Sequence, residues 1–143
     1  MPSAQRSVVI NRLVADVFAF FTTPANETRW RTHVKEVSAT GPVAVGSRIH
    51  QVVTGPGGRG IPADLEVTAY EPPERYAFQV VAGPVRPTGE YVFTADGDTT
   101  TVAMSLTAEL SGLKKLLMSG AVQRSMNGEM AALDRAKELL ETP

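Results

Sequence analysis

The chain has 143 residues and a formal net charge of −1 from 14 basic and 15 acidic side chains. This length suits one domain with a substantial core, and the near-neutral charge gives no field that favours nucleic acid or an anionic membrane. The chain has no cysteine, which excludes a disulfide scaffold and thiolate metal sites, and it has no apolar run long enough to cross a bilayer. We therefore expect a cytoplasmic protein without nucleic-acid partners or an integral membrane segment.

The first thirty residues are expected to form a strand and two helices. Residues 4–10 are rich in β-branched side chains, which favours a strand. Apolar side chains at helical spacing between Leu13 and Phe21 predict a first helix. Pro24 is typical of a first helical turn, so it predicts a short second helix that ends near Trp30, the only tryptophan.

Six further strands are predicted, because the apolar pattern then changes to a period of two and turn residues divide it. They lie near residues 34–39, 47–54, 61–70, 75–82, 88–95 and 99–109. In the last four, one set of alternating side chains is mostly apolar, which is typical of an antiparallel sheet with one face in the core. The side chains expected to face inward are Ile61, Ala63, Leu65, Val67, Ala69, Tyr76, Phe78, Val80, Tyr91, Phe93, Val102, Met104, Leu106, Ala108 and Leu110.

Residues 113–141 are expected to form one long helix, because they contain no strong helix breaker apart from two glycines. Its apolar stripe fits the concave face of the sheet. Three methionines in the stripe are either ordinary core or an adaptable wall for apolar ligands, since thioether side chains repack easily. The stripe comprises Met118, Val122, Met126, Met130, Leu133 and Leu140, and a solvated face is expected for Glu129, Asp134, Glu138 and Glu141.

Short motifs along the chain carry a family resemblance. They are Val14-Ala15-Asp16-Val17-Phe18-Ala19-Phe20 with Pro24, Asn26 and Trp30, then Gly46 after a Gly-Pro turn, Tyr70-Glu71-Pro72-Pro73, Asp98-Thr99-Thr100 and Leu139-Leu140-Glu141. With the order of elements, they resemble the START-like superfamily (SRPBCC, Bet v 1-like), and most of all its bacterial polyketide cyclase/dehydrase-like branch. The likeness covers nearly the whole chain as one domain, residues 1–143.

The resemblance implies an α+β helix-grip fold. In this fold a seven-stranded antiparallel sheet wraps around a long C-terminal helix, and two short helices lie between strands 1 and 2. A cavity between the sheet and the helix binds or transforms hydrophobic molecules of many kinds. These motifs are packing and turn signals, so they specify the fold better than the function.

The side chains on the inward faces are the candidate ligand-binding residues, because ligand pockets are mostly apolar with a few polar groups. We expect them to hold a small hydrophobic molecule such as a lipid, an isoprenoid or a polyketide-like compound. The predicted residues are Trp30, Ile49, Gln51, Leu65, Val67, Phe78, Tyr91, Phe93, Met104, Leu106, Met118, Val122 and Met126. Trp30 either packs the two helices against the sheet or forms part of the cavity entrance.

The strand at residues 47–54 has an ambiguous register. In one register Ile49 and Gln51 point inward, and in the other Arg48 and His50 do. We favour the first register, because the second buries charge without a visible partner. An inward His50 would favour catalysis.

Catalytic candidates are few, because general acid–base chemistry needs a titratable group in the cavity. Tyr91 and Tyr76 are the proton donors on the inward faces, and Gln51 or His50 would position an enolisable carbonyl. No metal site is predicted, because His33 and His50 are the only histidines and lie far apart in the sequence. No cofactor is predicted either.

Three function classes follow from these observations. The favoured one is a binding or carrier protein for a small hydrophobic ligand. The alternatives are a cofactor-independent enzyme of the polyketide cyclase or dehydratase type, and a protein-interaction domain like the chaperone activators of this fold. The sequence also leaves a homodimer open.

Overall fold

The computed structural model describes residues 2–142, apart from the side chains of Pro56 and Leu116. Its first strand, β1 (Ser3–Ile10), leads into α1 (Val14–Thr22), a 3₁₀ turn η1 (Pro24–Asn26) and α2 (Glu27–Trp30). The later elements are β2 (Val34–Ala39), β3 (Arg48–Thr54), a 3₁₀ turn η2 (Pro56–Gly58), β4 (Gly60–Pro62), β5 (Leu65–Glu71), β6 (Arg75–Val80), β7 (Thr88–Asp96), β8 (Thr99–Thr107) and α3 (Gly112–Glu141).

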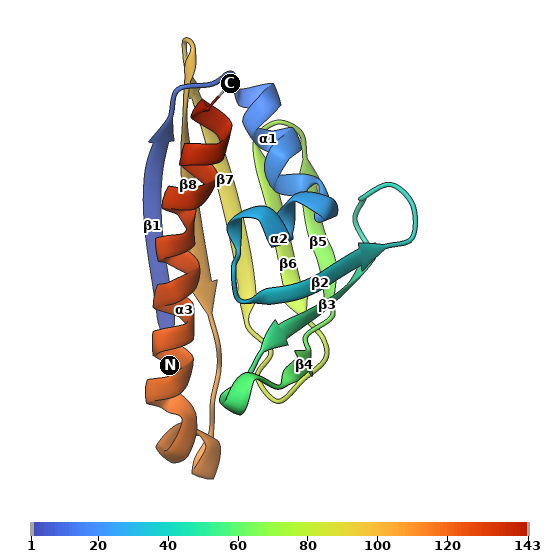
Figure 1. The fold of residues 1–143 in the computed structure, drawn as a ribbon, viewed down its shortest axis with the longest axis vertical. Helices are drawn as coiled ribbons and strands as arrows, with labels where there is room; N and C mark the ends of the chain where they lie inside the picture. The colour runs from blue at the N-terminus through green and yellow to red at the C-terminus, as the bar shows by residue number, and fades with distance from the viewer. Residues whose placement is uncertain (1, 143) are drawn as a thin grey trace.

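The strands form one curled antiparallel sheet, in the order β1-β8-β7-β6-β5-β3-β2, with β4 paired to β3. Figure 1 shows α3 lying along β1 and β8, while β2 and β3 run across the direction of the longer strands. Helix α1 lies over β7 and β8, and α2 lies against β2 and α3. This arrangement confirms the predicted α+β helix-grip fold with a long C-terminal helix. Within residues 2–142, the helices all lack the length or the apolar character needed to cross a membrane.

Seven strands follow one another across the sheet, as predicted, but the predicted strand over residues 61–70 is two strands, β5 in that order and the short β4 as an eighth strand paired only with β3. Both pair with β3 in one continuous register, since Val52 pairs with Pro62 and Ile49 with Leu65. Pro62 has no N–H to donate to the ladder, which explains why regular pairing stops there.

A bulge in β5 also corrects one predicted face. The pairing of β5 with β6 shifts by one residue between Val67 and Ala69. After the shift Tyr70 pairs with Tyr76, and its ring lies 5.5 Å from that of Phe18. Since adjacent side chains of a strand point to opposite faces, Tyr70 faces inward and Ala69 does not.

The core is built from the inward side chains of β6 to β8, the aromatic side chains of α1, and α3. Tyr91, Phe93, Val102, Met104 and Leu106 are all buried, as the alternating pattern predicts. The stripe on α3 packs against them: Val122, Met126, Met130 and Leu133 are buried, and Met118 and Leu140 are partly buried.

Candidate ligand-binding site

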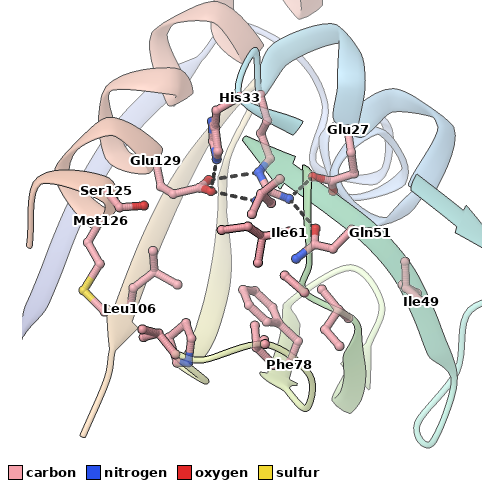
Figure 2. A pocket seen from close by; sticks show the side chains of 18 of the residues that line it. Glu27, His33, Ile49, Gln51, Ile61, Phe78, Leu106, Ser125, Met126 and Glu129 are labelled. Atoms are coloured by element: carbon pink, nitrogen blue, oxygen red, sulfur yellow. Dashed lines mark hydrogen bonds and ion pairs between the residues drawn. The ribbon is translucent and has the colours of Figure 1, made fainter. Parts of the chain in front are cut away.

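A cavity of about 400 Å³ lies between the curled sheet and the first half of α3. Most of the side chains that line it are apolar, and they come from α1, η1, β2 to β8, the loop before β7, and α3. Ten of the predicted ligand-binding residues line it: Ile49, Gln51, Leu65, Phe78, Tyr91, Met104, Leu106, Met118, Val122 and Met126. Figure 2 shows several of these side chains, among them Phe78 and Leu106.

Three predicted residues belong to the packed core and not to the cavity wall. Trp30 is completely buried with its ring 5.2 Å from that of Phe21, and Phe93 packs against Phe18 at 5.2 Å. Val67 is also completely buried. The aromatic side chains of α1 fill the space over this end of the sheet, so it is closed to a ligand. The indole N–H of Trp30 has no hydrogen-bond partner among the described residues.

The register of β3 matches the favoured alternative. Ile49 and Gln51 are each 4% exposed and line the cavity. His50 lies on the opposite face, where its Nδ1 is 2.7 Å from Asp64 and its Nε2 is 3.3 Å from Glu36. The hydrogen bond with Asp64 raises the pKa of His50. His50 is therefore not a catalytic residue of the cavity, because its side chain points out of the other side of the sheet.

A glycine shapes the floor of the cavity. Gly89 on β7 lies between Phe78 on β6 and Leu106 on β8. A Cβ atom at this position would overlap the Phe78 ring and would lie only 2.8 Å from Leu106. Because Gly89 has no side chain, the Phe78 ring lies directly over the backbone of β7, and the space above the ring belongs to the cavity.

A polar cluster lies at one end of the cavity, centred on Arg31 at the C-terminal end of α2. Nε and Nη2 of Arg31 donate to the two carboxylate oxygens of Glu129, at 2.9 and 2.7 Å. Nη1 donates to Glu27 at 2.9 Å and to the Gln51 side-chain oxygen at 3.1 Å. Nε2 of His33 contacts the same Glu129 oxygen as Nη2. We call these five residues the Arg31 cluster; Figure 2 shows the interactions as dashed lines.

The charges of the cluster are buried and mutually dependent. The side chains of Arg31, Glu129 and Glu27 are only 11%, 12% and 14% exposed. Burial raises the pKa of Glu129, but Arg31 and His33 outweigh it and lower that pKa to about 2. Burial also raises the pKa of Glu27, and there Arg31 does not compensate fully. Burial lowers the pKa of Arg31, yet the two carboxylates outweigh it and hold that pKa well above its ordinary value.

The Arg31 cluster is absent from the sequence-based predictions. Glu129 was expected on the solvated face of α3, but it lies on the buried side, three residues after Met126. Its position within the apolar stripe and the four-residue spacing of Glu27 and Arg31 are the signals that point to the cluster. In residues 2–142 no group of three or more histidine or acidic side chains is placed to hold a metal ion.

Two tyrosines contribute phenol groups to the cavity lining. Tyr76 and Tyr91 are 5% and 3% exposed, and their rings stack with centroids 6.0 Å apart. Burial raises the pKa of both phenols, so both stay protonated and able to donate at neutral pH. Neither hydroxyl forms a hydrogen bond with another residue of the described chain.

Solved structures share this fold across nearly the whole chain at low sequence identity. A crystal structure of a Thermus thermophilus protein has a TM-score of 0.79 and 19% identity, covering 96% of this chain and 95% of that one. A START superfamily protein from Mycobacterium smegmatis has a TM-score of 0.74 and 13% identity, covering 96% and 98%. The di-domain aromatase/cyclase StfQ of the steffimycin biosynthetic pathway has a TM-score of 0.78 and 15% identity, covering 97% of this chain and 50% of that one.

At these identities the solved structures establish the fold alone. The search of curated proteins gives no match. The family described as polyketide cyclase/dehydrase and lipid transport matches residues 1–141, which include every element of the fold and the whole cavity lining. The chain therefore belongs to the polyketide cyclase/dehydrase and lipid transport family.

Proposed function

We propose that this protein binds a small hydrophobic molecule in the cavity between the sheet and α3, as a binding or carrier protein. The observation that carries the proposal is the cavity itself. Protein interiors are close-packed, with few voids larger than a water molecule, so a space of about 400 Å³ is not a packing defect. Its size is within the range of about 300–1,000 Å³ that is typical of ligand sites.

The composition of the wall supports a ligand that is mostly apolar. Met104, Met118 and Met126 line the cavity together with aliphatic and aromatic side chains. Methionine side chains adapt to ligands of different shape, which suits a carrier. The charged side chains of the lining are gathered at one end, in the Arg31 cluster, and this gives the bound molecule a preferred orientation.

Filling the cavity tests this proposal. The wild-type protein is expected to bind the neutral fluorescent probe N-phenyl-1-naphthylamine, with a rise in fluorescence and in melting temperature. Val122→Trp should weaken binding about tenfold or more, because the indole occupies ligand space. Ser125→Phe, at an exposed position of the lining, is a second variant that strains the core less.

The matched control is Ala131→Trp, which adds the same side chain to an exposed position of α3 away from the cavity. It should bind the probe as the wild type does. The proposal is wrong if the wild type binds no apolar probe, or if folded Val122→Trp and Ser125→Phe bind it as tightly as the control.

A cyclase or dehydratase activity is the second candidate function. The observation in its favour is that His33 lines the cavity and contacts Glu129, since a carboxylate-oriented imidazole is a usual general base. The base would remove an α-proton from an enolisable ketone while Tyr76, Tyr91 or Gln51 donates to the carbonyl oxygen. This role falls to His33 because His50 lies outside the cavity.

Deuterium exchange separates the two functions. If the protein is an enzyme of this class, the methyl protons of bound 2-acetylnaphthalene should exchange in D₂O at least about tenfold faster than in buffer, and His33→Gln should abolish the gain. NMR measures the rate. Exchange at the buffer rate, with the ketone bound, would exclude this chemistry for a methyl ketone and leave binding as the function.

Among the described residues, Leu113 and Leu117 of α3 are exposed apolar side chains one helical turn apart, and the other large ones, such as Val45, are exposed elsewhere in the chain. A protein-interaction role stays a prediction from the sequence. The homodimer, the lack of nucleic-acid partners and the cytoplasmic location stay predictions from the sequence.

A further inference from the structure

The orientation of the Gln51 amide is fixed by its neighbour. Gln51 is 4% exposed, and its Oε1 accepts a hydrogen bond from Nη1 of Arg31 at 3.1 Å. A guanidinium group only donates hydrogen bonds, so the amide must present its oxygen to Arg31. Its Nε2 then points away from Arg31 into the cavity, and Figure 2 shows this nitrogen directed toward the middle of the lining side chains.

This nitrogen is an unused donor in an apolar space. Neither N–H of Gln51 Nε2 has a hydrogen-bond partner among the described residues, although the side chain is almost completely buried. A ligand atom that accepts a hydrogen bond at this position would pair with this donor inside an apolar space, where a hydrogen bond is electrostatically stronger than in water.

The charges around Gln51 decide which acceptor fits. Four of the five N–H groups of Arg31 already donate to Glu129, Glu27 and Gln51. Two carboxylates therefore face one guanidinium at this end of the cavity, with His33 alongside. An anionic ligand group would meet these carboxylates and would lose its hydration between apolar walls, both of which are unfavourable.

We propose that the cavity selects neutral apolar molecules that carry a carbonyl oxygen, which accepts a hydrogen bond from Gln51 Nε2, and that it rejects the corresponding carboxylates. This inference rests on the proposed binding function and deepens it. The phenol groups of Tyr76 and Tyr91 are further donors on the same wall, and they too match a neutral acceptor. A free fatty acid, with an ionised head group, is the wrong ligand for this site.

Three compounds of nearly equal shape test the selection on the wild-type protein. They are 2-acetylnaphthalene, 2-ethylnaphthalene and 2-naphthoate, which place a ketone, a hydrocarbon and a carboxylate on one ring system. Each competes with N-phenyl-1-naphthylamine at pH 7. The ketone is expected to bind about tenfold more tightly than the hydrocarbon, and about a hundredfold more tightly than the carboxylate.

Gln51→Leu should remove the preference for the ketone over the hydrocarbon, because leucine donates no hydrogen bond, and Gln51→Glu should do the same in its ionised form, which only accepts hydrogen bonds. Gln51→Glu keeps an oxygen that accepts the hydrogen bond from Arg31. This variant therefore tests the loss of the Nε2 donor without the loss of the contact with the Arg31 cluster. The control is Gln123→Leu, since the Gln123 amide bonds to Ser3 and Asn127 outside the cavity. A purely structural role of Gln51 would weaken all three ligands by the same factor and leave their ratio unchanged.

The outcomes separate this inference from the proposed function. Failure of the wild type to bind the probe and all three naphthalenes overturns both. Binding of the probe with 2-naphthoate as the tightest competitor, or with ketone and hydrocarbon equal, overturns the selection and keeps the binding function. A ketone preference that survives in both Gln51 variants also overturns the assignment to Gln51.

Discussion

Replacing Arg31 by methionine is expected to destabilise the fold by about 3–5 kcal/mol, because it leaves buried carboxylates without a cation. Glu129 and Glu27 are only 12% and 14% exposed, and each makes a hydrogen bond with the Arg31 guanidinium of 2.9 Å or shorter. Methionine has a similar volume, so the loss measures charge and hydrogen bonding more than packing. Urea unfolding at pH 7, followed by circular dichroism, measures the difference.

The matched control is Arg75→Met on the outer face of the sheet. Arg75 also pairs with two carboxylates, Glu71 and Glu90, but its side chain is 41% exposed. Solvent screening should make the loss there much smaller than in Arg31→Met. Equal losses in the two variants would contradict the view that burial gives the Arg31 cluster its importance.

A triple variant separates the charge effect from damage to the fold. Combining Arg31→Met with Glu27→Gln and Glu129→Gln removes the charges together, so much of the lost stability should return. Stability that stays as low as in Arg31→Met alone would show that the guanidinium acts mainly as a packing group.

The fold could be predicted because its signals are local. The alternation of Tyr91 and Phe93 on β7, and of Val102, Met104 and Leu106 on β8, places one face in the core without knowledge of the partner strand. The two deviations depend on neighbours instead. Pro62 interrupts the regular pairing because it has no N–H to donate to its partner strand β3. The bulge that turns Tyr70 inward is set by the pairing of β5 with β6.

The apolar part of the cavity was predictable for the same reason, whereas its polar end was not. Glu129 and Arg31 are 98 residues apart, and no local pattern states that they meet. Glu129 taken alone is a surface residue, because an unpaired charge does not belong in a core. Its position between Met126 and Leu133 conflicts with that interpretation, and such a conflict between local rules is typical of a functional site.

The three corrections in the cavity wall have a common cause. The alternation along the strands places Val67 and Phe93 on the inward face, and Trp30 follows the short second helix, but the sequence does not show how far the first helix extends over the sheet. Phe18 and Phe21 of α1 fill that region, with their ring centroids 5.2 and 5.8 Å from that of Phe93. The division of inward-facing residues into core and cavity is therefore a tertiary property, decided by the helices that cover the sheet.

Acidification should remove about 3 kcal/mol of stability through Glu129 alone. The pKa of this carboxyl is about 2 in the folded protein, against an ordinary value of 4.5. Since each pKa unit corresponds to about 1.36 kcal/mol, the folded state gains this amount when the carboxyl is ionised. Because folding lowers the pKa of Glu129, its ionised carboxyl stabilises the folded protein at pH values above the unfolded-state pKa of 4.5. This contribution disappears as the pH falls from there toward 2.

The effect of Glu129 on the pH dependence of stability has to be separated from that of Glu27, because protonation of Glu27 changes the stability in the opposite direction. Burial raises the pKa of Glu27, so its protonation favours the folded state as the pH falls. We therefore compare wild type with Glu129→Gln, in which Arg31, His33 and Glu27 still face position 129. The difference in unfolding free energy should be constant above about pH 5.5 and shrink by about 3 kcal/mol toward pH 2.

The control is Glu138→Gln, at a side chain that is 68% exposed, and its difference from wild type should not change with pH in this way. Parallel curves for wild type and Glu129→Gln would mean that Arg31 does not hold this carboxyl ionised.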